Sequence, residues 1–180
     1  MKEYILIVCM LISGISRLAG QSDVVFITIP VVNGRVVFEQ FILTDQELSA
    51  NQKYATLRKW VKDKYTGSPL VSSIRFDDKN QSVTVSAKTE LAGVPEKTVM
   101  NYRFDLSVDN AGCILVVRDI TYQSPPKQGE LSFPKVTTAE QTITDHAVNA
   151  LGEEGRARSN IRKATLAFLN NLHKEVLDLF

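Results

Sequence analysis

Asp145 and His146 are neighbouring residues of the types that serve as acid and base in hydrolases. Serine and threonine are plentiful, so a Ser–His–Asp hydrolase is conceivable. However, the chain has no Gly-X-Ser-X-Gly segment, which marks an activated serine in many hydrolases. We therefore expect His146 at an exposed helix position and assign no catalytic residue. Hydrolysis by His146 or by a carboxylate in a groove between sheet and helices stays the alternative function.

The other metal-ligating residue types are few and badly spaced. Neither Glu175 nor Asp178 stands four residues from His173, the spacing expected for joint metal ligation on a helix, so we expect His173 in solvent near a helix end. Cys113 opens a predicted strand and is expected to be a packing residue rather than a nucleophile. Two His and, after residues 1–20, one Cys cannot form a zinc site of standard composition, and the chain has no glycine-rich phosphate loop, so we expect no metal and no cofactor.

Polar side chains on three predicted strands form the candidate binding site. Residues 70–76, 82–91 and 97–108 alternate between apolar and polar types, which predicts one buried face and one wet face of a sheet. Along the third of these strands, Tyr102 and Phe104 point to one side, and Arg103 and Asp105 to the other. The candidate residues on the wet face are Arg75, Thr84, Lys88, Asn101, Arg103 and Asp105.

These strands belong to a sheet of about five. Residues 36–43 and 112–122 are the other two strands, and the short turns after residue 76 predict antiparallel pairing of the last four. Asn33-Gly34 predicts a tight hairpin before the first strand. Ser49 and Gln52 form a capping box that starts a helix, which ends at Gly67-Ser68-Pro69.

The C-terminal part is expected to be helical. Residues 123–137 contain Pro125-Pro126 and predict a linker, and Thr138 to Gln141 offer a second capping box. Gly152 or Gly155 should interrupt the helical region before a last amphipathic helix. This tail, residues 138–180, needs an apolar surface, either the buried face of its own sheet or a second copy in a homodimer.

Four segments resemble a known family. They are VVNGRVVFEQF at residues 31–41, SANQKYATLRKW at 49–60, the Asp77-Asp78 turn, and VMNYRFD at 99–105. Together they resemble a bacterial family of unknown function with a TATA-binding-protein-like (TBP-like) fold, over residues 26–122. The resemblance implies an α+β fold, with a curved antiparallel sheet backed by helices on one face, in exported proteins of Gram-negative bacteria. It implies no reaction, ligand or catalytic residue.

The first 20 residues predict a secretory signal peptide. Lys2 precedes an apolar run from Ile5 to Ile15, and small residues precede an expected cleavage after Gly20. The run is too short to span a membrane, and no later segment approaches the length required. The domains expected are thus a signal peptide at 1–20, a TBP-like domain at 21–122, a linker at 123–137 and a helical tail at 138–180.

The net charge of the chain limits the kinds of partner that it can bind. Removal of residues 1–20 leaves 19 basic and 19 acidic side chains, whereas nucleic-acid binding normally needs an excess of cations. We expect no nucleic-acid partner and no membrane span after the leader. The leading hypothesis is a non-enzymatic protein of the periplasm or cell envelope that binds a protein, peptide or glycan.

Overall fold

The computed structural model describes residues 24–44, 47–95, 97–125 and 133–180. The predicted signal peptide lies outside them. No helix within these ranges is long and apolar enough to cross a membrane. The elements are β1 (Val31–Val32), β2 (Arg35–Val36), β3 (Phe38–Leu43), α1 (Ala50–Tyr65), β4 (Val71–Asp77), β5 (Ser82–Glu90), β6 (Val99–Val108), β7 (Gly112–Ser124), β8 (Lys135–Thr138), α2 (Ala139–Thr142), α3 (Asp145–Val148) and α4 (Gly152–Leu177).

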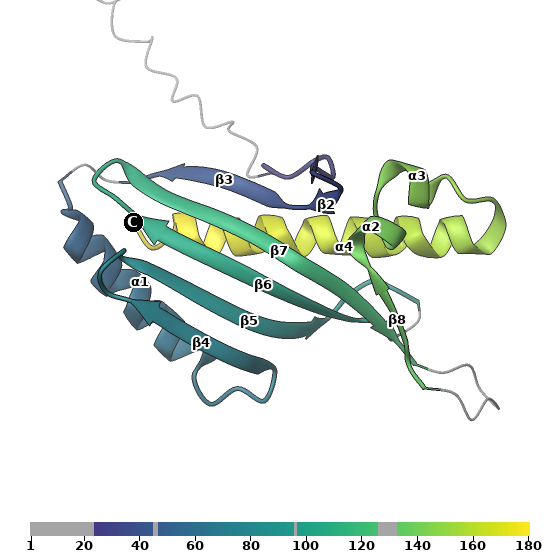
Figure 1. The fold of residues 1–180 in the computed structure, drawn as a ribbon, viewed down its shortest axis with the longest axis horizontal. Coiled ribbons are helices and arrows are strands. Elements are labelled where there is room, and N and C mark those ends of the chain that lie inside the picture. The colour runs from purple at the N-terminus through teal and green to yellow at the C-terminus, as the bar shows by residue number, and fades with distance from the viewer. Residues whose placement is uncertain (1–23, 45–46, 96, 126–132) are drawn as a thin grey trace, which may run out of the picture.

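A six-stranded antiparallel sheet forms one layer of the molecule. Its strand order is β3-β7-β6-β5-β4, and β8 pairs with the end of β7. Helices α1 and α4 lie behind the sheet in Figure 1 and leave the near face uncovered. The predicted α+β class, the antiparallel sheet and the helices on one face are confirmed.

Local signals place the elements as expected. Asn33 and Gly34 both have positive φ, 51° and 76°, as the tight turn between β1 and β2 requires. At the start of α1 the Gln52 backbone N–H donates to the Ser49 hydroxyl, and the Gln52 side chain accepts from the Ser49 backbone N–H. Along β6, buried residues alternate with half-buried ones over the whole strand.

The segment predicted as a linker contains a strand. β7 continues through Ser124, and β8 pairs with its last four residues, with Thr121 opposite Thr138. Because β3 pairs only with Gly112 to Val117, this edge of β7 is open for β8. Residues 126–132 of the predicted linker lie outside the described ranges.

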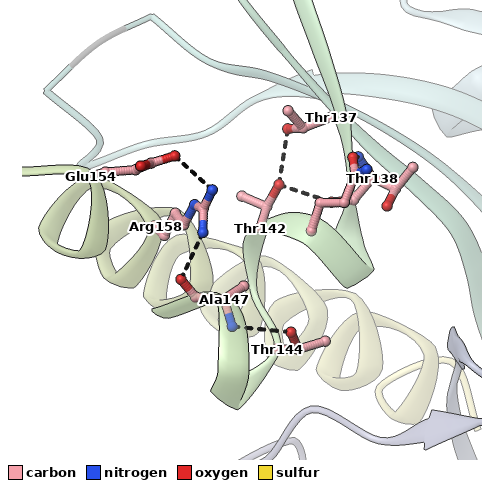
Figure 2. Close-up of polar contacts among 8 residues, drawn as sticks. Thr137, Thr138, Thr142, Thr144, Ala147, Glu154 and Arg158 are labelled. Carbon is pink, nitrogen blue, oxygen red and sulfur yellow. Dashed lines mark hydrogen bonds and ion pairs between the residues drawn. The ribbon is translucent and has the colours of Figure 1, made fainter. Parts of the chain in front are cut away.

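The predicted helical tail begins with two short helices. The first, α2, ends at Thr142, and Thr144 caps α3, since its hydroxyl accepts from the Ala147 N–H at 3.4 Å. Arg158 of α4 donates to the Ala147 carbonyl at 3.0 Å and to the Glu154 carboxylate at 2.6 Å, so α3 is held against α4 (Figure 2). Gly155 lies inside α4, where a Cβ would meet the Ala150 carbonyl oxygen.

α4 then runs across the covered face of its own sheet. Its residues Leu169, Leu172 and Val176 are buried in the same apolar cluster as the strands and α1. The Tyr122 and Thr165 hydroxyls, both buried, are hydrogen-bonded at 2.9 Å. The sequence left open whether the apolar stripe of this helix packs on its own sheet or on a second copy. In the structure it packs on its own sheet.

Candidate functional site

The uncovered face of the sheet brings the predicted site residues into neighbouring rows. Side chains of directly opposite residues share a face in paired strands. Thr84 lies opposite Asp105, Ser86 opposite Arg103, and Lys88 opposite Asn101. On the next strand, β7, Arg118 lies opposite Arg103. Register thus places three of the predicted residues, Thr84, Arg103 and Asp105, beside a residue that the sequence analysis missed.

Asp105 is the centre of this group. The Thr84 hydroxyl donates to Asp105 Oδ1 at 2.6 Å, and Arg103 Nη2 donates to the same oxygen at 3.2 Å. Arg118 Nε donates to Oδ2 at 2.9 Å. Both carboxylate oxygens are used, so Asp105 fixes two guanidinium groups side by side. We call Thr84, Arg103, Asp105 and Arg118 the Asp105 network.

The environment keeps Asp105 ionised. Partial burial acts to raise the pKa of the carboxyl, but the hydrogen bonds from Thr84 and Arg118 and the charge of Arg103 outweigh it, so the pKa lies below its ordinary value. The Asp105 side chain is 25% exposed and that of Arg103 35%. The pairs are therefore less screened than ordinary surface ion pairs and still reachable from solvent.

A hollow of about 550 Å³ adjoins the network. It crosses the sheet from the start of β4 to Asp119 in β7, and Ser72, Ser86, Lys88, Asn101 and Arg103 contribute to its lining. Two irregularities of strand pairing lie along it, one between β4 and β5 and one between β6 and β7. Such irregularities bend and twist a sheet locally, which accounts for a depression at this place.

Asp119 marks the second irregularity. It has a φ of 55°, which is uncommon for a residue other than glycine, and it interrupts the alternation along β7. The two consecutive polar residues Arg118 and Asp119, between the apolar run of residues 113–117 and the alternating residues 120–123, are the sequence signal for this bulge. The same signal would have placed Arg118 on the uncovered face.

The remaining predicted residues surround the network without joining it. Arg75 is exposed on the edge strand β4, opposite Thr84. Lys88 and Asn101 line the hollow; Lys88 is exposed, and the Asn101 amide donates to the Thr121 hydroxyl at 3.4 Å.

The residues considered for catalysis lie elsewhere. His146 is exposed on α3, away from the residues that line the hollow. Cys113 is fully buried, and burial raises the pKa of its thiol to about 12. The expectation for His173 was wrong: it is only 8% exposed, because its face of α4 packs on the segment before β1, with the Phe26 ring at 6.2 Å. In the described part of the chain, no three His, Cys, Asp or Glu side chains form a possible metal site.

Two solved structures are similar to this chain. One is a TBP-like protein from Parabacteroides distasonis ATCC 8503, with 22% identity and a TM-score of 0.73, covering 84% of this chain and 96% of that protein. The other is a DUF4468 family protein from Bacteroides ovatus ATCC 8483, with 21% identity and a TM-score of 0.67, covering 89% of this chain and 95% of that protein.

Comparison of sequences alone finds less. No family model matches the chain, and no curated protein is similar to it. The two structural matches extend beyond the residues 26–122 that carried the resemblance, since they cover more than four fifths of the chain. The sheet with its backing helices is therefore the TBP-like fold that the sequence implied.

Proposed function

We propose that the protein is an exported, non-enzymatic binding module of the cell envelope, which holds a protein, peptide or glycan partner on the uncovered face of its sheet. The observation that carries the proposal is the Asp105 network beside the hollow. Polar side chains that are already fixed lose little further freedom when a partner binds.

Export and the envelope location rest on the sequence. The signal-peptide pattern of residues 1–20 supports passage across the inner membrane of a Gram-negative bacterium. Because fold does not determine function, the TBP-like architecture adds no partner by itself.

Nucleic acid is a poor candidate for the partner. The balance of 19 basic and 19 acidic residues after the leader supplies no general attraction to phosphate. On the uncovered face, Arg103 and Arg118 are both paired with Asp105. Their charges are partly neutralised before any partner arrives.

Affinity capture tests the proposal. Residues 21–180, immobilised, would be offered envelope extract, and bound proteins and glycans would be identified by mass spectrometry. Ser86→Tyr places a large side chain in the hollow whatever the charge of the partner, and Lys59→Tyr, at an exposed position of α1, is the control. We expect the wild type and Lys59→Tyr to retain a partner that Ser86→Tyr loses. Equal capture by all three would contradict the role of this face.

The hydrolase alternative has its own test. The purified protein would be assayed against panels of esters, peptides and glycosides, together with His146→Ala. Turnover that the His146→Ala change abolishes would replace the binding-module proposal. We expect no such turnover, since His146 is exposed on α3 and is not among the residues that line the hollow.

A further inference from the structure

The two arginines of the Asp105 network have hydrogen-bonding capacity to spare. A guanidinium group has five N–H donors. Among the bonds between described residues, Arg103 uses Nη2 and Arg118 uses Nε, both toward Asp105. Arg103 Nε is buried and has no partner in this part of the chain. Asp105 therefore orients two guanidinium groups whose remaining Nη donors make no bond to another described residue, whereas the buried Arg103 Nε is out of reach of solvent.

The charges along the hollow favour an anionic group. Lys88 and Arg103 line it, Arg118 adjoins it, and Asp119 is the one acidic side chain among its described lining residues. Asp105 accepts from both arginines and so reduces, without removing, the positive charge at this end. A single carboxylate fits this excess better than a multiply charged phosphate chain, and guanidinium groups bind carboxylates through paired N–H donors.

The lining also favours a peptide over a sugar. Sugar rings are commonly held by stacking on aromatic side chains, and Tyr102 is the one aromatic residue in the described lining of the hollow. The Tyr102 ring packs against Phe168 of α4 at 4.8 Å, on the covered side of the sheet. What the hollow offers instead is hydroxyl and amide groups, from Ser72, Ser86 and Asn101.

We propose that the hollow binds the carboxylate of an aspartate or glutamate in an acidic peptide segment of the partner. Arg103 and Lys88 contact the carboxylate, the Asn101 amide and the Ser86 hydroxyl bond neighbouring polar groups, and Asp105 positions Arg103. The inference rests on the proposed function, because it takes the uncovered face as the binding surface and adds the chemistry of what is bound.

A titration with defined peptides tests it. Isotopically labelled protein would be titrated with acetylated, amidated hexaglutamate while the Nε–H signals of Arg103 and Arg118 and the backbone signals are followed by NMR. Hexaglutamine, of equal length and no charge, is the control ligand. We expect saturable shifts at Arg103, Lys88 and Asn101 with hexaglutamate only, weakening as added salt screens the charges.

Variants separate a built site from general attraction. Arg103→Ala should weaken hexaglutamate binding about tenfold or more, the loss expected for a charge-assisted hydrogen-bonded contact. Arg103→Lys keeps the charge without the planar donors, and its affinity for hexaglutamate should lie between those of the wild type and Arg103→Ala. Lys79→Ala removes an exposed cation from the turn between β4 and β5, outside the hollow, and should change binding less than about twofold. Unchanged unfolding midpoints would show that the variants are folded.

Three results would overturn the inference. They are equal shifts with hexaglutamine, no shifts in the hollow, or shifts centred on Lys59 and Lys62 of α1 that survive Arg103→Ala. Any of them would leave the proposed function standing if Ser86→Tyr still abolished capture of a partner. If hexaglutamate did not bind in the hollow and Ser86→Tyr also left capture unchanged, both the proposed function and the inference would be wrong.

Discussion

The two faces of the sheet are held in order by different interactions. On the covered face, Phe104 is fully buried, with the Tyr65 ring at 5.5 Å and the Trp60 ring at 6.3 Å. On the uncovered face, its neighbour Asp105 orders Arg103 and Arg118 through charged hydrogen bonds at partial exposure. Adjacent residues of β6 thus face different environments, the apolar core behind the sheet and the charged network on the uncovered face.

That contrast has a direct consequence for substitutions. Apolar burial contributes most of the free energy of folding, whereas exposed or half-exposed ion pairs contribute little. Changes on the covered face should therefore unfold the protein, and changes on the uncovered face should leave it folded and alter binding. The following experiments try to break this division, beginning with the largest effect.

Thiol reactivity should differ most between the faces. In residues 21–180, Cys113 is the single cysteine, buried on the covered face with a pKa raised to about 12 by desolvation and by the charge of Asp109. It should react with a colorimetric disulfide reagent only as fast as the protein unfolds. A cysteine placed on the uncovered face by Ser86→Cys, in a Cys113→Ala background, should react within the mixing time. Rapid reaction of native Cys113 would mean that the covered face opens readily.

Phe104→Ala should destabilise the protein severely. Truncation of a fully buried phenylalanine removes apolar burial and leaves a cavity, at a cost of about 3–5 kcal/mol. Urea unfolding followed by tryptophan fluorescence would measure the loss, with Arg103→Ala as the adjacent control on the other face. A smaller loss for Phe104→Ala than for Arg103→Ala would reverse the assignment of the faces.

Thr165→Val tests the polar contact within the covered face. The Thr165 hydroxyl is hydrogen-bonded to Tyr122 at 2.9 Å and donates to the Ile161 carbonyl at 2.8 Å. Valine keeps the shape and leaves the buried Tyr122 hydroxyl without this partner, at a cost of about 1–3 kcal/mol. The double variant with Tyr122→Phe should recover part of the loss in the same unfolding assay, and additive losses would argue against the pairing.

Asp105→Asn should have the smallest effect on stability, about 1 kcal/mol at neutral pH, because the network is partly screened by solvent. The pKa of Asp105 is lower in the folded than in the unfolded state, so its contribution is present above the unfolded value and is lost as the pH falls through the folded one. Acid unfolding curves should therefore show less loss of stability below about pH 4 in the variant. A steeper acid loss in Asp105→Asn would show that the carboxylate is not stabilised as described.

Much of the fold could be predicted because its signals are local. The alternation along β5 and β6, the Asn33-Gly34 turn and the capping box of α1 each lie within a few residues of the structure that they specify. Register also follows partly from such patterns, since a slip by one residue would turn the apolar side chains of β6 to solvent. The wet-face residues were identified in this way.

What was missed depends on contacts distant in sequence. β3 pairs with only the first part of β7, and β8 pairs with the part of the same edge that β3 leaves open. No local pattern in residues 135–138 indicates this pairing. His173 is buried because residues 24–29 return across α4, where the Asn170 side chain bonds the backbone of Val25 and Phe26. For Arg118 the polar pair with Asp119 is a local signal, but its place beside Arg103 follows from the register of β6 and β7, across a bulge that shifts the pairing.

Photo-cross-linking in cells is the most direct test of the division between the faces. A photoreactive phenylalanine would replace exposed Ser73 on the uncovered face, or exposed Lys59 on α1, in otherwise unchanged protein. We expect a discrete cross-linked partner from position 73 that is lost on adding Ser86→Tyr, and none from position 59. A partner cross-linked from position 59 and not from position 73 would contradict it, because recognition would then lie on the helical side of the molecule.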